Sequence, residues 1–162
     1  MAKTFEDFKE CVAVSDKAFV DEVNTLFVKN DCRTEVKEAK SGYVATYYYM
    51  RDKKKIPVMN YVFRKDGMKT RIYARHIAYF QSFLDTLPEG MKKDVRKSNI
   101  CKKISGISEC SPTCKGGYEF VMDGETHKKC KNMAFFWSVC EENNASILQF
   151  LEHELKYMDV DS

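Results

Sequence analysis

The chain has 162 residues, of which 44% are hydrophobic and 13% aromatic, and its formal net charge is +3. This length and composition predict a single domain with a hydrophobic core and exclude an intrinsically disordered chain. No apolar run reaches the length of about 18 residues that spans a membrane, and the charged residues 1–7 do not resemble a signal peptide. We therefore expect a cytoplasmic protein without a membrane partner.

Two helices and then four strands are expected in the first half of the chain. Residues 5–12 and 15–30 place apolar side chains at helical spacing, and Ser15 is a candidate N-cap for the second helix. The strands, predicted from alternation or from β-branched and aromatic content, cover residues 32–39, 43–50, 56–63 and 68–75. Asp66-Gly67 predicts a tight turn between the last two strands, because both residues tolerate positive φ.

The second half of the chain shows helices first and then another hairpin. Apolar residues over 77–87 and 91–95 predict two helices, and Pro88 can open the second. Residues 118–122 predict a strand, Asp123-Gly124 a second turn, and Glu125 begins a strand that leads to residues 134–137. A last helix is expected from the apolar positions between 147 and 158, with Asn143-Asn144 as its cap.

Residues 1–162 are therefore expected to form one α+β domain. Its architecture would be an antiparallel sheet of about six strands with helices packed on one face. The spacing Y-x-F-x-x-D-G occurs at Tyr61 and again at Tyr118, and a helix follows each hairpin. This echo suggests a duplicated hairpin–helix unit, and chance convergence on a common hairpin sequence is the alternative.

Four of the seven cysteines fall in a loop and hairpin over residues 99–131. They are Cys101, Cys110, Cys114 and Cys130, in the spacing C-x8-C-x3-C-x15-C. In a reducing compartment, clustered cysteines indicate metal or redox chemistry more often than disulfides. Four thiolates suit tetrahedral zinc, and the neighbouring lysines would offset the negative charge of such a site. We therefore predict a structural zinc site at these residues, with His127 as an alternate ligand.

The four clustered cysteines are also compatible with roles that do not involve zinc. Their spacing differs from the standard zinc knuckles, and it matches neither common ferredoxin pattern, which makes an iron–sulfur cluster the less favoured cofactor. Thiol redox sensing and ordinary unliganded cysteines are further alternatives. The remaining cysteines, Cys11, Cys32 and Cys140, lie in predicted helices or strands, so we expect them in the core.

Tyrosines and basic residues of the predicted sheet form a second candidate site. Tyr47, Tyr49, Tyr61 and Tyr73 could line a small-molecule pocket or a base-stacking platform, and Arg71 could add selectivity for anions. Packing between neighbouring strands is the alternative. Residues 64–103 carry eleven Lys/Arg against four Asp/Glu. This local excess is compatible with an anionic partner, and a solvated basic face accounts for it equally well.

One segment carries a family resemblance. Leu87-Pro88-Glu89-Gly90, the four clustered cysteines, Gly117-Tyr118-Glu119-Phe120 and Asp123-Gly124 together resemble a family of small uncharacterised bacterial proteins. The resemblance covers residues 57–157, and its cysteine spacing is its most specific part. It implies no activity, because none is associated with the family.

No catalytic motif accompanies these features. The chain lacks a recognisable Ser/His/Asp or Cys/His arrangement, an H-E-x-x-H helix and a phosphate-binding loop. We therefore expect a non-enzymatic bacterial binding domain with a structural zinc site, whose partner is a small molecule or a protein, with nucleic acid less favoured. The alternative is a thiol-based redox or stress sensor. A third hypothesis is an enzyme that binds a small molecule in the tyrosine-lined pocket.

Overall fold

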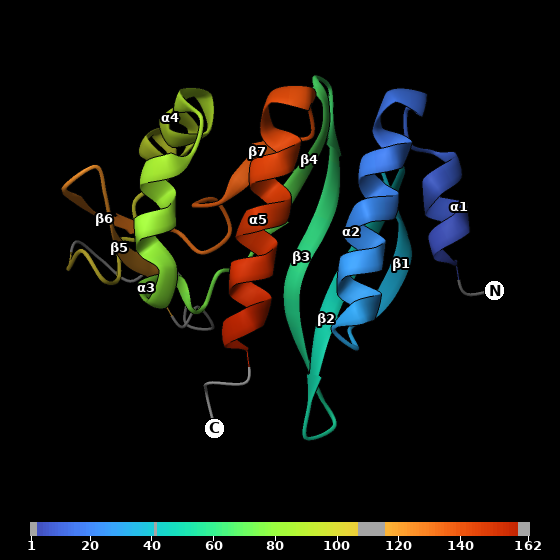
Figure 1. Ribbon diagram of the computed structural model, residues 1–162, viewed down its shortest axis with the longest axis horizontal. Helices are drawn as coiled ribbons and strands as arrows, with labels where there is room; N and C mark the ends of the chain where they lie inside the picture. The colour runs from blue at the N-terminus through green and yellow to red at the C-terminus, as the bar shows by residue number, and fades with distance from the viewer. Residues whose placement is uncertain (1–2, 41, 107–115, 159–162) are drawn as a thin grey trace.

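The computed structural model describes residues 3–40, 42–106 and 116–158 (Figure 1). The α-helices are α1 (Phe5–Glu10), α2 (Lys17–Lys29), α3 (Ile77–Phe80), α4 (Glu89–Lys97) and α5 (Glu141–Tyr157), and two 3-10 helices are η1 (Val14–Asp16) and η2 (Gln81–Thr86). The strands are β1 (Arg33–Ala39), β2 (Gly42–Arg51), β3 (Lys54–Arg64), β4 (Gly67–Ile72), β5 (Tyr118–Met122), β6 (Glu125–Lys129) and β7 (Phe136–Ser138). None of the helices in the described ranges is long and apolar enough to cross a membrane.

The strands form two antiparallel sheets. One has five strands in the order β1-β2-β3-β4-β7, and the other is the β5–β6 hairpin. The α+β class with an antiparallel sheet is thus confirmed, and the sheet has five strands, with two further strands in a separate hairpin. The hairpin is separate because β6 ends at Lys129, and the chain turns through residues 130–135 before β7 pairs with β4, with Thr70 opposite Trp137. The predicted strand from Glu125 to residue 137 is therefore two strands in two sheets.

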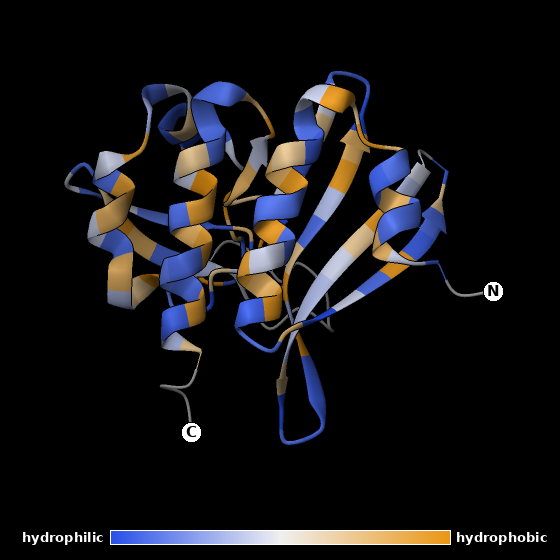
Figure 2. Cartoon of the chain, turned by 45° about the vertical axis from the view of Figure 1, so that its right-hand side comes forward, coloured by the Kyte–Doolittle hydropathy of each residue, from blue (hydrophilic) through white to orange (hydrophobic). Residues whose placement is uncertain are grey.

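Helices α1, α2 and α5 bury one face of the five-stranded sheet in an aromatic core. The Phe27 ring of α2 stacks on Tyr47 of β2 with centroids 4.2 Å apart, and the Phe8 ring of α1 stacks on Tyr61 of β3 at 5.1 Å. At the β7 edge of the sheet, the Phe150 ring of α5 contacts the Trp137 ring of β7 edge to face, with centroids 5.0 Å apart. Figures 1 and 2 show α2 and α5 on the same side of the strands.

The opposite face of this sheet is defined by alternation along the strands. We call it the open face, because Arg33, Lys37, Lys55 and Arg64 are exposed on it, whereas Val62 in its middle is buried. Its charged members are Arg33, Lys37, Lys55, Arg64, Lys69, Arg71 and Glu35. Tyr48 and Phe136, both half-buried, supply its aromatic rings near these charges.

A β-bulge in β3 changes the side of the sheet on which the side chains of its first residues lie. Tyr47 pairs with Met59 and Tyr48 with Pro57, so Val58 is an extra residue in β3. Val58 and Met59 are both fully buried, although consecutive strand residues normally face opposite sides. The bulge therefore sets the side on which residues 54–57 lie.

The two hairpin turns differ in register despite their shared sequence. In β3–β4, Arg64 pairs with Gly67, so residues 65–66 form the loop and Gly67 already belongs to β4. In β5–β6, Met122 pairs with Glu125, and the loop is Asp123-Gly124, with φ of 51° and 79°. The D-G pair thus occupies different positions in the two turns, which argues against a duplicated hairpin–helix unit and for chance convergence.

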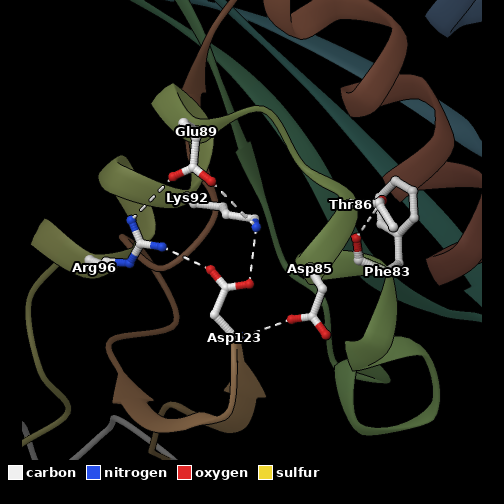
Figure 3. A network of polar contacts seen from close by, with 7 residues as sticks. All are labelled: Phe83, Asp85, Thr86, Glu89, Lys92, Arg96 and Asp123. Atoms are coloured by element: carbon white, nitrogen blue, oxygen red, sulfur yellow. Dashed lines mark hydrogen bonds and ion pairs between the residues drawn. The ribbon is translucent and has the colours of Figure 1, made fainter.

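The β5–β6 hairpin packs against η2 and α4 through both apolar and charged groups. Phe120 and Met122 are buried, and the Phe120 ring lies 5.2 Å from that of Phe135. At the turn, the Asp123 carboxylate accepts hydrogen bonds from Lys92 Nζ (3.0 Å) and Arg96 (2.8 Å) of α4, as Figure 3 shows. These bonds lower the pKa of Asp123 and raise that of Lys92.

Candidate metal centre

Cys101 and Cys130 lie on either side of one β-bridge. Ile100 pairs with Lys129, the Cys101 N–H donates to the Lys128 carbonyl (2.8 Å), and the Cys130 N–H donates to the Asn99 carbonyl (2.8 Å). Residues 99–101 thereby contact the end of β6 through a single β-bridge. In such a pairing, the two cysteines are diagonal neighbours on one face, with α-carbons about 7–8 Å apart. Their side chains can therefore converge on a common point.

Gly117 brings a third chain segment against these cysteines. A Cβ atom built at Gly117 would lie 2.0 Å from the Lys129 carbonyl oxygen and 2.9 Å from Cys101 Cβ, so no side chain fits there. The neighbouring Gly116 has φ of 108°, a conformation that favours glycine. The glycine pair thus lets the chain that enters β5 touch Cys101 directly.

A cavity of about 330 Å3 opens beside the two cysteines. It is lined by Asn99, Ile100, Cys101, Lys102, Gly116, Gly117, Cys130 and Lys131. Cys101 is 5% exposed, whereas Cys130 is half-buried. A cavity of this kind, with two thiols and two ammonium groups, suits a charged thiolate site.

Only some of the neighbouring lysines line this cavity. Lys128 forms an ion pair with Glu119 (3.8 Å), and Lys129 donates to the carbonyls of Arg96 (2.8 Å) and Ser98 (3.0 Å) at the end of α4. Burial lowers the pKa of Lys129. Among the residues that the structure describes, Lys102 and Lys131 are the lysines that line the cavity.

The remaining predicted ligands divide into two groups. Cys110 and Cys114 lie outside the described residues. His127 is described, and its ring stacks on that of Phe120 with centroids 5.6 Å apart. Alternation along β6 places His127 on the opposite side of the strand from Lys128 and Cys130. This orientation disfavours His127 as an alternate ligand, which stays a prediction. In the ranges that the structure describes, no three His, Cys, Asp or Glu side chains are grouped closely enough to hold a metal ion.

The other three cysteines, all described, do not line this cavity. Cys11 is exposed after α1, so its predicted core position is wrong. Cys32 packs against the core and is half-buried, and burial raises the pKa of its thiol to about 11. Cys140 is the N-cap residue of α5, and burial raises the pKa of its thiol.

The structure does not gather the predicted tyrosine site into one pocket. Tyr47 and Tyr61 are fully buried in the core, where the Tyr47 hydroxyl donates to Asn24 (2.8 Å), and Tyr49 packs against the same core. The expectation that they line a ligand pocket is therefore wrong, and packing against the helices is the reason. Arg71 lies on the open face.

Tyr73 lines a different cavity, next to the cysteines. This cavity, about 390 Å3 in volume, is lined by Pro57, Tyr73, Arg75, Gly116, Tyr118, Lys131 and Asn132. It shares Gly116 and Lys131 with the cysteine-lined cavity. The two hollows therefore adjoin at the glycine pair.

A buried ionisable pair at the start of α3 was not predicted from the sequence. Glu154 of α5 is fully buried and accepts a hydrogen bond from the His76 backbone N–H (3.0 Å), and its second oxygen lies 2.7 Å from His76 Nδ1. Burial raises the pKa of Glu154, and the His76 bonds partly oppose this effect. One signal was present in the sequence: Glu154 lies seven residues after Ile147, on the apolar stripe of the helix.

Comparisons of the chain with protein-family models, curated proteins and solved structures returned no match. The resemblance to small bacterial proteins with the same cysteine spacing therefore stays a prediction. What the chain can do has to be argued from the chemistry of its own residues.

Proposed function

We propose that the chain is a non-enzymatic binding domain whose β5–β6 region is held together by a structural zinc site, with Cys101, Cys110, Cys114 and Cys130 as ligands. The observation that carries this proposal is the position of Cys101 and Cys130, which follow the two residues of one β-bridge, Ile100 and Lys129, and line the same cavity. Two residues far apart in the chain thus present thiols to one place. Such convergence is what a metal site in a reducing compartment requires.

The sequence offers a third ligand next to this cavity. Cys114 is three residues before Gly117. Gly117 touches Cys101. Zinc bound by four thiolates would carry two negative charges, and Lys102 and Lys131 would partly neutralise them.

The donor chemistry favours zinc over harder ions. Thiolates are soft ligands that select zinc, copper(I) or iron–sulfur clusters rather than magnesium or calcium. A structural site would tie together the end of α4, the start of β5 and the end of β6, because its ligands follow or precede these elements. In this role, the ion stabilises the hairpin and takes no part in a reaction.

Metal analysis of the purified protein tests the proposal. We expect about one zinc ion per chain after purification without chelators. Cys101→Ser and Cys130→Ser should each lower the zinc content severalfold, whereas Cys11→Ser, at an exposed cysteine, should retain it. Far-UV circular dichroism of each variant shows whether the sheet is intact. Wild-type protein that stays metal-free after incubation with zinc and gel filtration would refute the proposal.

A thiol-based redox or stress sensor is the second candidate. It is favoured by one observation: Cys130 is half-buried beside Lys131 rather than fully enclosed. A sensor would be isolated without metal, and its thiols would react rapidly with a disulfide reagent. Measuring zinc content together with the rate of thiol reaction therefore separates the two functions.

A further inference from the structure

The open face carries a strong excess of positive charge. Its charged members are six cations and a single carboxylate, Glu35. Since the whole chain carries only +3, the remaining surface is net negative. The charge is therefore concentrated on one face of one sheet. A partner that binds this face by charge complementarity must be anionic.

Several of these cations form no close ion pair, although Arg33 and Lys37 are near enough to Glu35 to help Lys55 lower the pKa of that carboxyl. Lys69 pairs with Asp66 (3.0 Å), and Lys55 pairs with Glu35. Within the described part of the chain, Arg33, Lys37, Arg64 and Arg71 form no ion pair with a carboxylate. Arg71 instead donates to the Asn132 carbonyl (2.9 Å), which leaves its positive charge uncompensated.

Planar groups are interleaved with these charges. The guanidinium groups of Arg64 and Arg71 lie 5.6 Å and 5.1 Å from the centroid of the Phe136 ring. At the other end of the face, Lys55 Nζ lies 4.9 Å from the centroid of Tyr48. Aromatic rings and guanidinium planes on a basic surface are the groups on which unpaired bases stack.

We propose that the open face binds single-stranded nucleic acid. The cations would contact the phosphates, and Phe136, flanked by two arginines, would provide a stacking position for a base. A duplex fits this surface less well. Five strands at a spacing of about 4.8 Å span about 19 Å, whereas the major groove is about 12 Å wide, and the bases of a duplex are already stacked. An acidic peptide would satisfy the charges and leave the rings without a specific role.

A groove continues the open face at its β7 edge. It has a volume of about 260 Å3 and lies between β7 and the end of α4, where Lys69, Lys97, Ser98, Asn99, Phe136 and Asp94 line it. The amide of Asn99 and the hydroxyl of Ser98 are groups that can hydrogen-bond the edges of an unpaired base. This groove is beside Phe136, so a stacked base and a base in the groove could be neighbours.

Fluorescence anisotropy with labelled oligonucleotides tests the proposal. The probes are a 20-nucleotide oligouridine, an oligothymidine of the same length and a 20-base-pair DNA duplex. We expect both single strands to bind more tightly than the duplex at 50 mM salt. If four phosphates are contacted, raising the salt to 200 mM should weaken binding roughly 50-fold. The two single strands distinguish RNA from DNA as the preferred form.

Charge-reversal variants locate the binding surface. Arg64→Glu with Arg71→Glu should weaken binding at least about tenfold, because two phosphate contacts are replaced by repulsion. Phe136→Ala should weaken it about tenfold through loss of stacking. The matched control is Lys29→Glu with Lys156→Glu, which makes the same change in net charge at exposed positions on α2 and α5. It should change the affinity by less than about twofold.

Three results would overturn the proposal. The first is the absence of single-strand binding at 50 mM salt by protein with a native circular dichroism spectrum. The second is an equal loss of affinity in the open-face and control variants. The third is a preference for another ligand. This would be tighter binding to the duplex than to the single strands, or, with lipid vesicles of phosphatidylcholine and phosphatidylserine as a further probe, binding to the vesicles alone. Because none of the substituted residues is a cysteine, these outcomes are independent of the zinc content.

Discussion

The five-stranded sheet and the β5–β6 hairpin are stabilised by different kinds of contact. In the sheet, rings from α1 and α2 stack on rings of β3 and β2, a ring of α5 meets one of β7 edge to face, and these side chains are fully buried. The hairpin contributes Phe120 and Met122 to the core, and its turn is held by charged groups of α4. A two-stranded hairpin is marginal in water on its own. The stability of the hairpin therefore depends on its contacts with the rest of the molecule.

This difference indicates where a metal ion would have its effect. Removing zinc should leave the aromatic core intact and loosen the hairpin, because the proposed ligands follow α4 or flank β5 and β6. Regions held by few apolar contacts open at lower free energy than the core. Substitutions in the aromatic core and in the β5–β6 hairpin can test whether the two regions differ in stability.

The largest effect is expected from Phe150→Ala in α5. Phe150 is fully buried and contacts Phe80, Phe135 and Trp137. Its truncation should lower the free energy of unfolding by about 3–5 kcal/mol, measured by urea denaturation. Val28→Ala, at a position that is 60% exposed, should change it by less than about 0.5 kcal/mol. Similar values for both variants would contradict the assignment of the core.

His76→Ala should be the next most damaging change, because it acts where the two regions meet. The substitution leaves the Glu154 carboxyl fully buried with one of its two His76 contacts, the backbone N–H. Breaking a buried pair in this way costs about 3 kcal/mol. Urea denaturation measures the loss. The double variant His76→Ala with Glu154→Leu should recover part of it, since it removes the uncompensated group.

Gly117→Ala should destabilise the hairpin by about 1–3 kcal/mol. The added methyl group would lie 2.0 Å from the Lys129 carbonyl oxygen, so β5 has to move away from β6 and from Cys101. Native-state hydrogen exchange should show the loss at residues 118–129 and spare β1–β4. Gly90→Ala, which meets no atom within 4 Å, is the control. Uniform loss of protection over both sheets would show that the hairpin is not a separate unit.

The pH dependence of stability reports on Glu154. Its pKa is raised above the ordinary value of 4.5 by burial. Between the two values, the folded protein binds more protons than the unfolded chain, so stability falls as pH rises through this window. Below the ordinary value the contribution is fully present. Glu154→Gln should flatten this part of the profile, measured as the free energy of unfolding from pH 4 to pH 8. An unchanged slope would assign the effect to another group.

The smallest effect is expected from Asp123→Asn at the hairpin turn. The substitution keeps the turn and removes the negative charge that Lys92 and Arg96 contact (Figure 3). Partly exposed ion pairs contribute little, so the melting temperature should fall by less than about 3 °C. High salt should produce a similar decrease in wild-type protein and a smaller one in the variant.

The sequence predicted local elements better than their assembly. Alternation places Tyr47 and Tyr48 on opposite faces, and the structure buries the first and leaves the second half-buried. The expected tyrosine pocket failed because alternation does not say which face the helices cover. The pairing of β7 with β4 depends on contacts between segments far apart in the chain, which local patterns do not encode. For the same reason, the spacing of Cys101 and Cys130 predicted a shared site without revealing the bridge that joins them.

The bulge at Val58 makes the length of β3 as important as its composition. Because strand side chains alternate, removing one residue there would exchange the inward and outward positions of everything from residue 54 to residue 57. Ile56 would then face solvent, and Lys55 would point into the aromatic core. A single deletion would therefore put Lys54 in the place of Lys55 on the open face and separate Lys55 from Glu35, with which it forms an ion pair. Replacing Val58 with another apolar residue would keep both Ile56 and Lys55 on their present sides of the sheet.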